Sequence, residues 1–288
     1  MNLKQKLKCL LVAHSKFVKY QVCLYLKQKP DLIIPVFEGA GLANVTHPEP
    51  GVKKTIQHLL ETTTGTFIDV GANIGQTLLT VKACQRNAPY IGFEPQHACI
   101  GYLARLISVN QFPHCDIFPL GLWSEHNVSQ IHTSGAYDAG SSLIPELRSR
   151  EYTATQICCA EKGDRVMNDL NNPRVSIIKI DVEGAELEVL DGFANTVARQ
   201  RPFIIAEIHP IDEIPKTSDL AIEREARYAK WRDFSSINEY TCFQIAETGI
   251  YKSENFAAKI MDPDPSNYLF APTEQVKKLQ NLITVPPQ

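Results

Sequence analysis

Apolar and polar positions alternate in blocks along residues 51–271, and the blocks predict a regular succession of helices and strands. Short apolar runs of strand length lie at 66–70, 90–94, 115–120, 175–181, 202–208, 239–246 and 267–271. Segments with helical spacing lie at 51–62, 75–86, 97–110, 163–170, 185–190 and 217–233. Nearly continuous apolar runs are typical of strands that are buried on both faces. We therefore expect an α/β fold, with a mostly parallel sheet covered by helices on both faces.

Two further segments, 128–133 and 153–160, have a strand-like pattern and flank a Gly- and Ser-rich loop at 134–142. They interrupt the alternation, so we expect them to form extra β structure beside the main sheet. A short helix is expected after residue 271. The resulting division is 51–272 for the main domain and 273–288 for a C-terminal helix and tail.

The first 29 residues contain seven lysines and no acidic residue, with apolar residues spaced along one helical stripe. We expect an amphipathic helix here, and a helix docked on the main domain is favoured because such a stripe most often faces a protein core. A basic helix on a membrane surface and a targeting peptide are the alternatives. Residues 30–50 are rich in Pro and Gly and predict a linker or lid, so residues 1–50 form an N-terminal helical cap.

Composition narrows the class of protein. The net charge of −3 and the pI near 6.3 argue against broad binding to nucleic acid. The eight cysteines are scattered without a C-x-x-C pair, which favours a reduced, cytoplasmic protein over a disulfide framework or zinc site. No apolar run is long enough for a transmembrane helix. The oligomeric state stays open.

The turn after the first strand carries the clearest chemical signal. Asp69-Val-Gly71-Ala-Asn73-Ile-Gly75 ends a strand and opens a helix, and Glu94 ends the next strand. A carboxylate at that point suits a pair of ribose hydroxyls. The glycine spacing is not the G-x-G-x-x-G that seats a pyrophosphate. We therefore expect S-adenosylmethionine, whose cationic groups would favour Asp69, over a dinucleotide or an ordinary strand-to-helix turn.

Charged residues also lie inside and at the ends of later strands. Asp181 ends the strand that contains Lys179, and His209 ends the strand that contains Glu207. A buried ammonium without a partner is costly. Counted back from the strand ends, Lys179 and Glu207 occupy matching positions. We therefore predict a buried Lys179–Glu207 pair beneath an Asp181–His209 rim, with a purely structural pair as the alternative.

Four motifs taken together resemble the FkbM family of S-adenosylmethionine-dependent methyltransferases. They are D-V-G-A-N-I-G-Q, F-E-P, I-K-I-D-V-E-G-A-E-L-E-V-L-D-G and R-P-F-I-I-A-E-I-H. The resemblance spans roughly residues 52–271. It implies a Rossmann-like class I methyltransferase sheet of seven strands with the last one antiparallel, and O-methylation, frequently of sugars. It assigns Asp69, Gly71, Asn73 and Gly75 to the cofactor loop and Glu94 to the ribose, and places Asp181 and Glu183 at the border of cofactor and substrate.

The chain departs from the family pattern in two places. Lys162-Gly-Asp-Arg165 replaces the usual turn before the fourth helix, and the acid that contacts adenine in many class I enzymes is missing near Gly121. We expect adenine to be bound by backbone groups near Gly121 or by Asn110. The resemblance at Ser141-Ser142-Leu143 favours a lid over a solvated connector, with Tyr137 and Ser142 contacting the ligand.

The expected function is S-adenosylmethionine-dependent O-methylation of a sugar or glycan hydroxyl. The hydroxyl proton needs a base, for which His209 or Asp181 is a candidate and Glu183 an alternative, with Lys179 and Glu207 completing the catalytic set. A divalent metal bridging Asp181, Glu183 and His209 is conceivable, but we expect a metal-free enzyme. The alternatives are a dinucleotide-dependent oxidoreductase and a non-catalytic cofactor-binding module that partners a glycosyltransferase.

Overall fold

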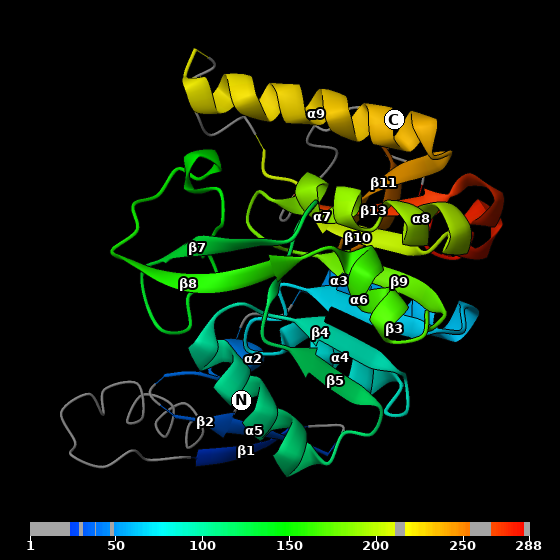
Figure 1. Ribbon diagram of the computed structural model, residues 1–288. Coiled ribbons are helices and arrows are strands. Elements are labelled where there is room, and N and C mark those ends of the chain that lie inside the picture. Colours follow the sequence, from blue (N-terminus) through cyan, green and yellow to red (C-terminus); the bar gives the residue numbers. More distant parts are fainter. Residues whose placement is uncertain are drawn as a thin grey trace.

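The computed structural model describes residues 24–28, 31–37, 39–46, 49–210, 217–253 and 266–284. At its centre is an eight-stranded sheet in the order β12-β11-β13-β10-β9-β3-β4-β5 (Figure 1). The strands are β3 (Thr66–Val70), β4 (Tyr90–Phe93), β5 (Cys115–Phe118), β9 (Val175–Ile180), β10 (Phe203–Glu207), β11 (Tyr240–Ala246), β12 (Gly249–Lys252) and β13 (Asn267–Pro272).

The direction of the strands agrees with the class I methyltransferase expectation, with one addition. Strands β5, β4, β3, β9 and β10 are mutually parallel. Strand β13 runs antiparallel to both β10 and β11. The additional strand, β12, pairs antiparallel with β11 at the edge of the sheet, so the sheet has eight strands where seven were expected.

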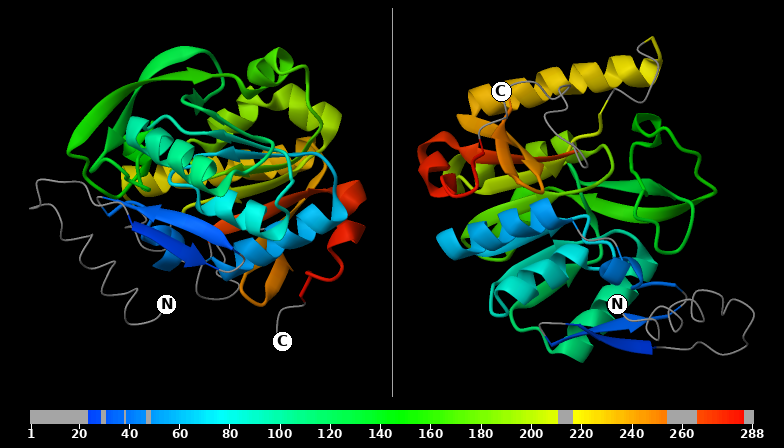
Figure 2. Two further views of the ribbon diagram at one scale, coloured as in Figure 1. Left: turned by 90° about the horizontal axis from the view of Figure 1, so that it is seen from below. Right: turned by 180° about the vertical axis from the view of Figure 1, so that it is seen from behind.

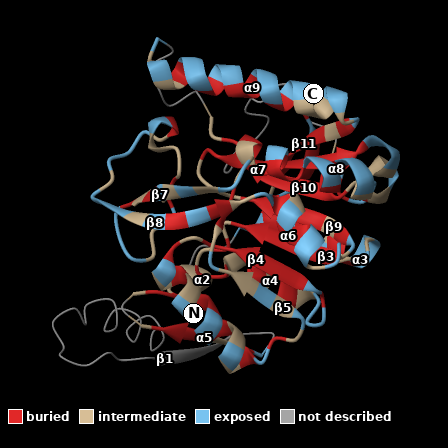
Figure 3. Ribbon diagram, in the orientation of Figure 1, coloured by how far each residue is buried: buried red, intermediate tan, exposed pale blue. Residues whose placement is uncertain are grey.

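Helices cover both faces of the sheet, as predicted. One face carries α3 (Pro50–Thr62), α4 (Gln76–Cys84) and α5 (His97–Asn110), and the other α6 (Gly163–Asp169), α7 (Glu186–Gly192), α8 (Ala194–Gln200) and α9 (Asp219–Ile237). Helix α8 was not predicted. Apart from the edge strand β5, the strands of this sheet are buried almost throughout (Figure 3).

Side chains alternate across each strand and supply two separate cores. In β3, Phe67 packs with the α3–α5 core, whereas Ile68 packs with the core under α6–α9. In β9, Ile177 and Ile178 divide in the same way. The near-continuous apolar runs in the sequence reflect this burial on both sides of the sheet.

A second, three-stranded sheet projects beside the carboxyl ends of the main strands (Figure 1). It consists of β6 (Gly121–Leu122), β8 (Ala154–Glu161) and β7 (Asn127–Thr133), in that order. Strands β7 and β8 pair antiparallel. The long connection between them contains a short 3-10 helix, η2 (Pro145–Leu147). The two extra strand-like segments of the sequence therefore do form β structure outside the main sheet.

The N-terminal region differs from the predicted helical cap. Residues 1–23 lie outside the described residues, but β1 (Leu24–Gln28) is a strand that pairs antiparallel with β2 (Leu32–Val36). The prediction of a helix up to residue 29 is therefore wrong for 24–28, because strand pairing satisfies the backbone there. The hairpin lies beside α5 (Figure 2) and is followed by the short helix α2 (Ala43–Thr46).

The C-terminal part of the described chain is a 3-10 helix, η3 (Thr273–Leu279), where a short helix was expected. None of the helices in the described part of the chain combines the length and apolarity needed to cross a membrane.

Candidate active site

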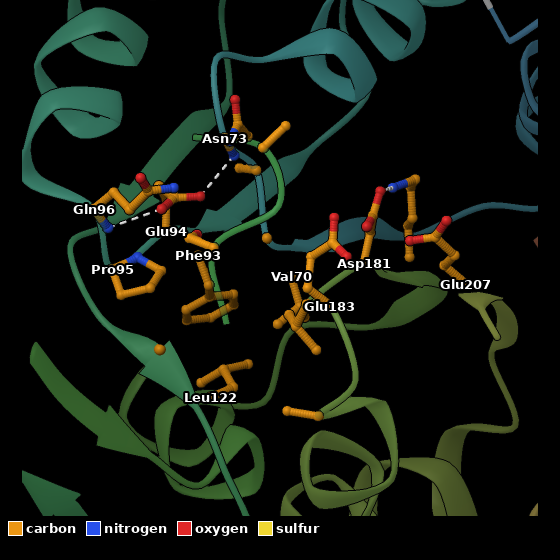
Figure 4. A pocket seen from close by; sticks show the side chains of 18 of the residues that line it. Val70, Asn73, Phe93, Glu94, Pro95, Gln96, Leu122, Asp181, Glu183 and Glu207 are labelled. Carbon is orange, nitrogen blue, oxygen red and sulfur yellow. Dashed lines mark hydrogen bonds and ion pairs between the residues drawn. The ribbon is translucent and has the colours of Figure 1, made fainter. Parts of the chain in front are cut away.

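A cavity opens at the carboxyl ends of β3, β4, β9 and β10, the position where open α/β sheets bind ligands. In Figure 4, Asn73, Glu94 and Gln96 gather on one side of it. Asp181 and Glu207 lie on the other side. We refer to these as the nucleoside end and the acidic end.

The turn between β3 and α4 brings the backbone at Gly71 against Asp181, the residue that follows β9. Gly71 has φ +84°, and a Cβ atom there would lie 1.9 Å from the carbonyl oxygen of Asp181. Gly75 also has φ +84° and precedes the first residue of α4, but it does not line the cavity. Gly71 and Asn73 line the cavity as expected, whereas Gly75 contributes only the shape of the turn.

Glu94 is a buried carboxylate at the nucleoside end, with 3% of its surface exposed. It accepts hydrogen bonds from the backbone N–H groups of Asn73 (2.7 Å) and Gln96 (2.8 Å). Burial raises its pKa to about 7 despite these bonds. Each carboxylate oxygen can accept more than one hydrogen bond, so Glu94 retains the capacity to bind the hydroxyl pair predicted for it.

Asp69 does not face the cavity, and its prediction as a cofactor contact is corrected. Strand alternation turns its side chain to the same side of the sheet as Phe67, where it is fully buried. The Tyr90 hydroxyl donates a hydrogen bond to Asp69 Oδ2. Burial raises the pKa of Asp69 to about 6, and the nearby ammonium of Lys179 opposes that shift.

The acidic end is organised around Lys179 and Asp181. Lys179 is almost fully buried, and its Nζ atom lies 2.8 Å from Asp181 Oδ2. The predicted Lys179–Glu207 pair is wrong because the register places Ile205 of β10 beside Lys179. Glu207 instead follows Ala206, the partner of Ile180, which places it next to Asp181 across the two strands.

The two neighbouring carboxyl groups have opposite pKa shifts. Burial would raise the pKa of Asp181, but Lys179 and hydrogen bonds bring it below its ordinary value. Burial, followed by repulsion from Asp181, raises the pKa of Glu207 well above its ordinary value. Asp181 is therefore the ionised member of the pair, and Glu207 carries the shared proton.

His209 lies beside Glu183, not beside Asp181 as predicted. Its Nε2 atom is 3.2 Å from Glu183 Oε2, and it does not line the cavity. The Arg148 guanidinium also contacts His209 and lies 2.5 Å from Glu183 Oε2. Glu183, Glu207 and His209 present ligand atoms within 4.8 Å of one another. A cation there would have to displace Arg148, which already supplies positive charge.

The connection between β7 and β8 roofs the cavity, but through residues other than those predicted. Ala139, Ser141 and Leu143 line it. Tyr137 packs against Phe37 and Tyr102, outside the cavity. Ser142 also faces away, and its hydroxyl donates to the backbone oxygen of Glu183 (2.9 Å). The expectation of ligand contacts from Tyr137 and Ser142 is thus corrected, because both side chains attach the roof to its surroundings.

Asn110 does not line the cavity, so its prediction as a cofactor contact is also corrected. It lies at the end of α5 and bonds both backbone groups of Ile33 in β2, each at 2.7 Å. Gly121 does line the cavity, next to the apolar side chains Phe93, Leu122, Ile131 and Leu143. These side chains give this part of the cavity an apolar lining, which suits a purine.

Three residues at or near the site were not found from the sequence. Gln96 donates its side-chain amide to the backbone oxygen of Asp138 (2.9 Å), joining the nucleoside end to the roof. The sequence could have indicated Gln96, because it directly follows the motif residues Glu94-Pro95. Glu49 lines the cavity from the residue before α3, and Arg148, on the β7–β8 connection, forms an ion pair with Glu183. Neither lies near the motifs in the chain, so only the tertiary structure brings them to the site.

The chemistry of the lining residues fits S-adenosylmethionine. Lys179 is the single cation among the described residues that line the cavity, which also include Glu49, Glu94, Asp181, Glu183 and Glu207. This excess of carboxyl groups suits a cofactor with a sulfonium and an ammonium. The first turn of α4, through Gln76 and Thr77, also lines the cavity. Helix N-termini bind carboxylates well, so this turn suits the amino-acid carboxylate.

The chain is similar in sequence to known methyltransferases. Residues 69–240 match the family model described as the methyltransferase FkbM domain. A methyltransferase of Sordaria araneosa, sdnD, is 28% identical over 153 residues, covering 44% of this chain and 59% of its own length. This chain therefore matches less than two thirds of that relative.

Solved structures with similar folds include an FkbM methyltransferase from Methylobacillus flagellatus KT, at 15% identity and a TM-score of 0.41. The match covers 72% of this chain and 43% of that one. An O-methyltransferase from Bacillus cereus, solved with S-adenosylhomocysteine, gives 10% identity and a TM-score of 0.43, covering 79% and 82%. Because the family model spans more than half of the sequence, from Asp69 to Tyr240, this chain belongs to the FkbM methyltransferase family.

Proposed function

We propose that the protein transfers a methyl group from S-adenosylmethionine to a hydroxyl group of a sugar or glycan. The observation that carries the proposal is one cavity with a buried carboxylate for a nucleoside at one end and an ionised carboxylate at the other. Glu94 occupies the nucleoside end, and Asp181 with Glu207 occupies the acidic end. Membership in the FkbM methyltransferase family supports the same reaction class.

At the nucleoside end, the chain binds and orients the donor. Glu94 accepts hydrogen bonds from the ribose hydroxyls, and the apolar side chains around Gly121 pack against the adenine. Gln76 and Thr77, at the start of α4, bind the amino-acid carboxylate. When bound, S-adenosylmethionine supplies a methyl group already activated on sulfur. Alignment and exclusion of water are thus the main tasks of the protein, and the roof formed by Ala139, Ser141 and Leu143 closes over the cavity.

At the acidic end, Asp181 removes the proton of the acceptor hydroxyl. The O–H bond breaks toward Asp181 as the oxygen–carbon bond forms, while the carbon–sulfur bond breaks and its electron pair stays on sulfur. Lys179 keeps Asp181 ionised. General base catalysis of this kind contributes about 10²–10⁴ to a rate.

The acidic end also suits an uncharged, hydroxyl-rich acceptor. Lys179 pairs with Asp181, Arg148 pairs with Glu183, and Glu207 carries a proton. The charges of Asp181, Glu183 and Glu207 are thus each paired or neutralised, although their oxygens still offer hydrogen-bonding positions. Such a surface binds sugar hydroxyls without requiring an acceptor of either charge.

The cofactor assignment is tested by calorimetric titration with S-adenosylhomocysteine. We expect Glu94→Ala to weaken binding about 10- to 100-fold, since a hydrogen bond to a charged group contributes roughly 1.5–3 kcal/mol. Glu125→Ala, which removes an exposed glutamate, serves as the matched control and should bind like the wild type. Equal affinities for Glu94→Ala and the wild type would refute the ribose assignment.

The reaction is tested by supplying S-adenosylmethionine with an isotopically labelled methyl group and a panel of glycosides. Mass spectrometry and NMR then locate the label. We expect a labelled methyl ether on a sugar oxygen. A label on nitrogen or carbon, or no transfer to any hydroxyl acceptor, would contradict the proposed function.

A further inference from the structure

Asp69 and Tyr90, under the cavity floor, and Lys179, which lines the cavity, form a buried polar chain that the proposed reaction so far uses only in part. We infer that Lys179, with Asp69 behind it, is a positioning residue that makes Asp181 the proton acceptor and leaves the shared proton on Glu207. The catalytic role of Lys179 rests on the proposed function, whereas its effect on the protonation of Asp181 and Glu207 does not.

Strand register gives Lys179 different neighbours on its two sides. Asp69 of β3 lies beside it on one side, and the aliphatic Ile205 of β10 lies on the other. Its ammonium forms an ion pair with Asp181 Oδ2 at 2.8 Å, whereas Ile205, not Glu207, is its neighbour in β10. The ammonium therefore stabilises the charge of one member of the carboxyl pair more than that of the other.

Asp69 has a donor of its own, which leaves Lys179 available to Asp181. The Tyr90 hydroxyl donates to Asp69 Oδ2, and both side chains are buried under the floor. Asp69 still lowers the free energy of the buried ammonium through its proximity, because a lysine in an apolar strand needs compensating charge. The chain of neighbouring polar groups thus runs from Tyr90 through Asp69, Lys179 and Asp181 to Glu207.

Other charged groups around the pair act in addition to Lys179. Glu49 faces Lys179 and Asp69, and His209 favours the charged form of Asp181. Glu183 and Glu186 face Glu207 and disfavour its charge. These groups reinforce the asymmetry of the pair, but the short bond from Lys179 is the contact that distinguishes Asp181 from Glu207.

Removal of the ammonium should abolish this distinction. Without the ammonium 2.8 Å away, the charge of Asp181 loses its nearest compensation, so the first deprotonation of the carboxyl pair moves to higher pH. In Lys179→Met, the acidic limb of the profile of kcat/KM against pH should therefore move up by at least about one unit, an approximately tenfold loss at a fixed pH on that limb. At higher pH the rate should recover toward that of the wild type.

Asp69→Asn gives a different prediction with the same geometry. This variant retains an oxygen for the Tyr90 hydroxyl, and Asp69, with a pKa of about 6, is already uncharged where Asp181 titrates, so the acidic limb should not move up. A purely structural role for Lys179 or Asp69 would lower the rate by the same factor at every pH. That result, or a shift of both variants in one direction, would overturn the inference.

A second readout does not depend on methyl transfer. Carboxyl ¹³C NMR titration of protein saturated with S-adenosylhomocysteine should show the protonation of the Asp181–Glu207 pair moving to higher pH in Lys179→Met. Loss of transfer in the wild type would refute the proposed function, and an unmoved carboxyl titration would refute this inference. If Lys179→Met fails to fold, the Asp69→Asn titration provides the test, and an upward shift there contradicts the inference.

Discussion

At the scale of single residues, Gly71 connects the cofactor loop to the acidic end. Its backbone is left-handed, and a Cβ atom at this position would approach the Asp181 carbonyl oxygen to 1.9 Å, so there is no room for a side chain. The amide of Asp181 donates to the Val70 carbonyl oxygen (3.0 Å) at the same crossing. A change here would disturb both ends of the cavity, since β3 and β9 meet at this point.

Gly71→Ala should therefore destabilise the protein by about 3 kcal/mol or more, through backbone strain and a clash with a carbonyl group. Urea unfolding measures this change. Gly101→Ala is the matched control, because Gly101 lies exposed in α5 and an added Cβ meets nothing within 4 Å. We expect Gly101→Ala to be neutral or stabilising by up to about 1 kcal/mol. Similar unfolding midpoints for the two variants would contradict this account.

Glu94 should make the stability of the cofactor-free protein depend on pH. The folded protein holds the Glu94 proton up to a pKa of about 7, whereas the ordinary value is 4.5. Between these values the unfolded state binds fewer protons, so the free energy of unfolding falls as the pH rises. Asp69, with a pKa raised to about 6, acts in the same direction.

In Glu94→Gln, the decrease in stability from pH 5 to pH 8 should be smaller than in the wild type by up to about 3 kcal/mol. Denaturant unfolding at both pH values gives the difference, with Glu125→Gln as the exposed control. Identical pH slopes for wild type and Glu94→Gln would show that Glu94 is not held in a protonated form.

At the scale of elements, the N-terminal hairpin is attached to α5 by specific polar contacts. Asn110 bonds the backbone N–H and C=O of Ile33, and the Tyr102 hydroxyl donates to the carbonyl oxygen of Pro35 (2.8 Å). Leu32, Ile34 and Val36 add buried apolar surface. These contacts place the hairpin against a helix of the main domain, on the side away from the acidic end.

Asn110→Ala should loosen β2 without removing the cofactor site. The loss of these bonds leaves two backbone groups of Ile33 unsatisfied, at a cost of about 1–3 kcal/mol each. Hydrogen exchange should increase at residues 31–37, while the affinity for S-adenosylhomocysteine stays near that of the wild type. Asn87→Ala, at an exposed turn, is the control. A large loss of affinity in Asn110→Ala would restore Asn110 as a cofactor contact.

At the scale of the whole molecule, the cavity is lined by residues of the eight-stranded sheet, of the three-stranded sheet and by Glu49, which precedes α3. Val70, Glu94, Leu122, Ile131 and Glu207 lie on five different strands or strand ends, yet all line it. A ligand bound there contacts elements that are distant in the chain. Binding should therefore stabilise the folded domain as a unit.

S-adenosylhomocysteine at 100 times its dissociation constant should stabilise the protein by about 2.7 kcal/mol. For a domain of this size, that raises the melting temperature by roughly 5–10 °C, at about 2–4 °C per kcal/mol. Differential scanning calorimetry measures the shift, and NAD at the same concentration should produce none. A larger shift with NAD would favour a dinucleotide site.

The motif-bearing turns and the strands beside them could be predicted because local signals determine them. The apolar runs of β3, β4 and β9, the turn at Gly71 and the carboxylate of Glu94 are all specified within a few residues. Strand β12 and helix α8 were missed, because a short edge strand and a short helix carry little periodic signal.

The sequence alone thus determined the family, the α/β sheet and the edge at which the cavity forms, because these depend on local periodicity and on motifs. The tertiary structure decided which side chains meet there. The register between β9 and β10 replaced Lys179–Glu207 by Lys179–Asp181 and Asp181–Glu207. Strand alternation turned Asp69 beneath the floor, and chain folding brought Glu49 and Arg148 to the site. Register and long-range packing arise from contacts across the whole chain, so spacing along one strand could not reveal them.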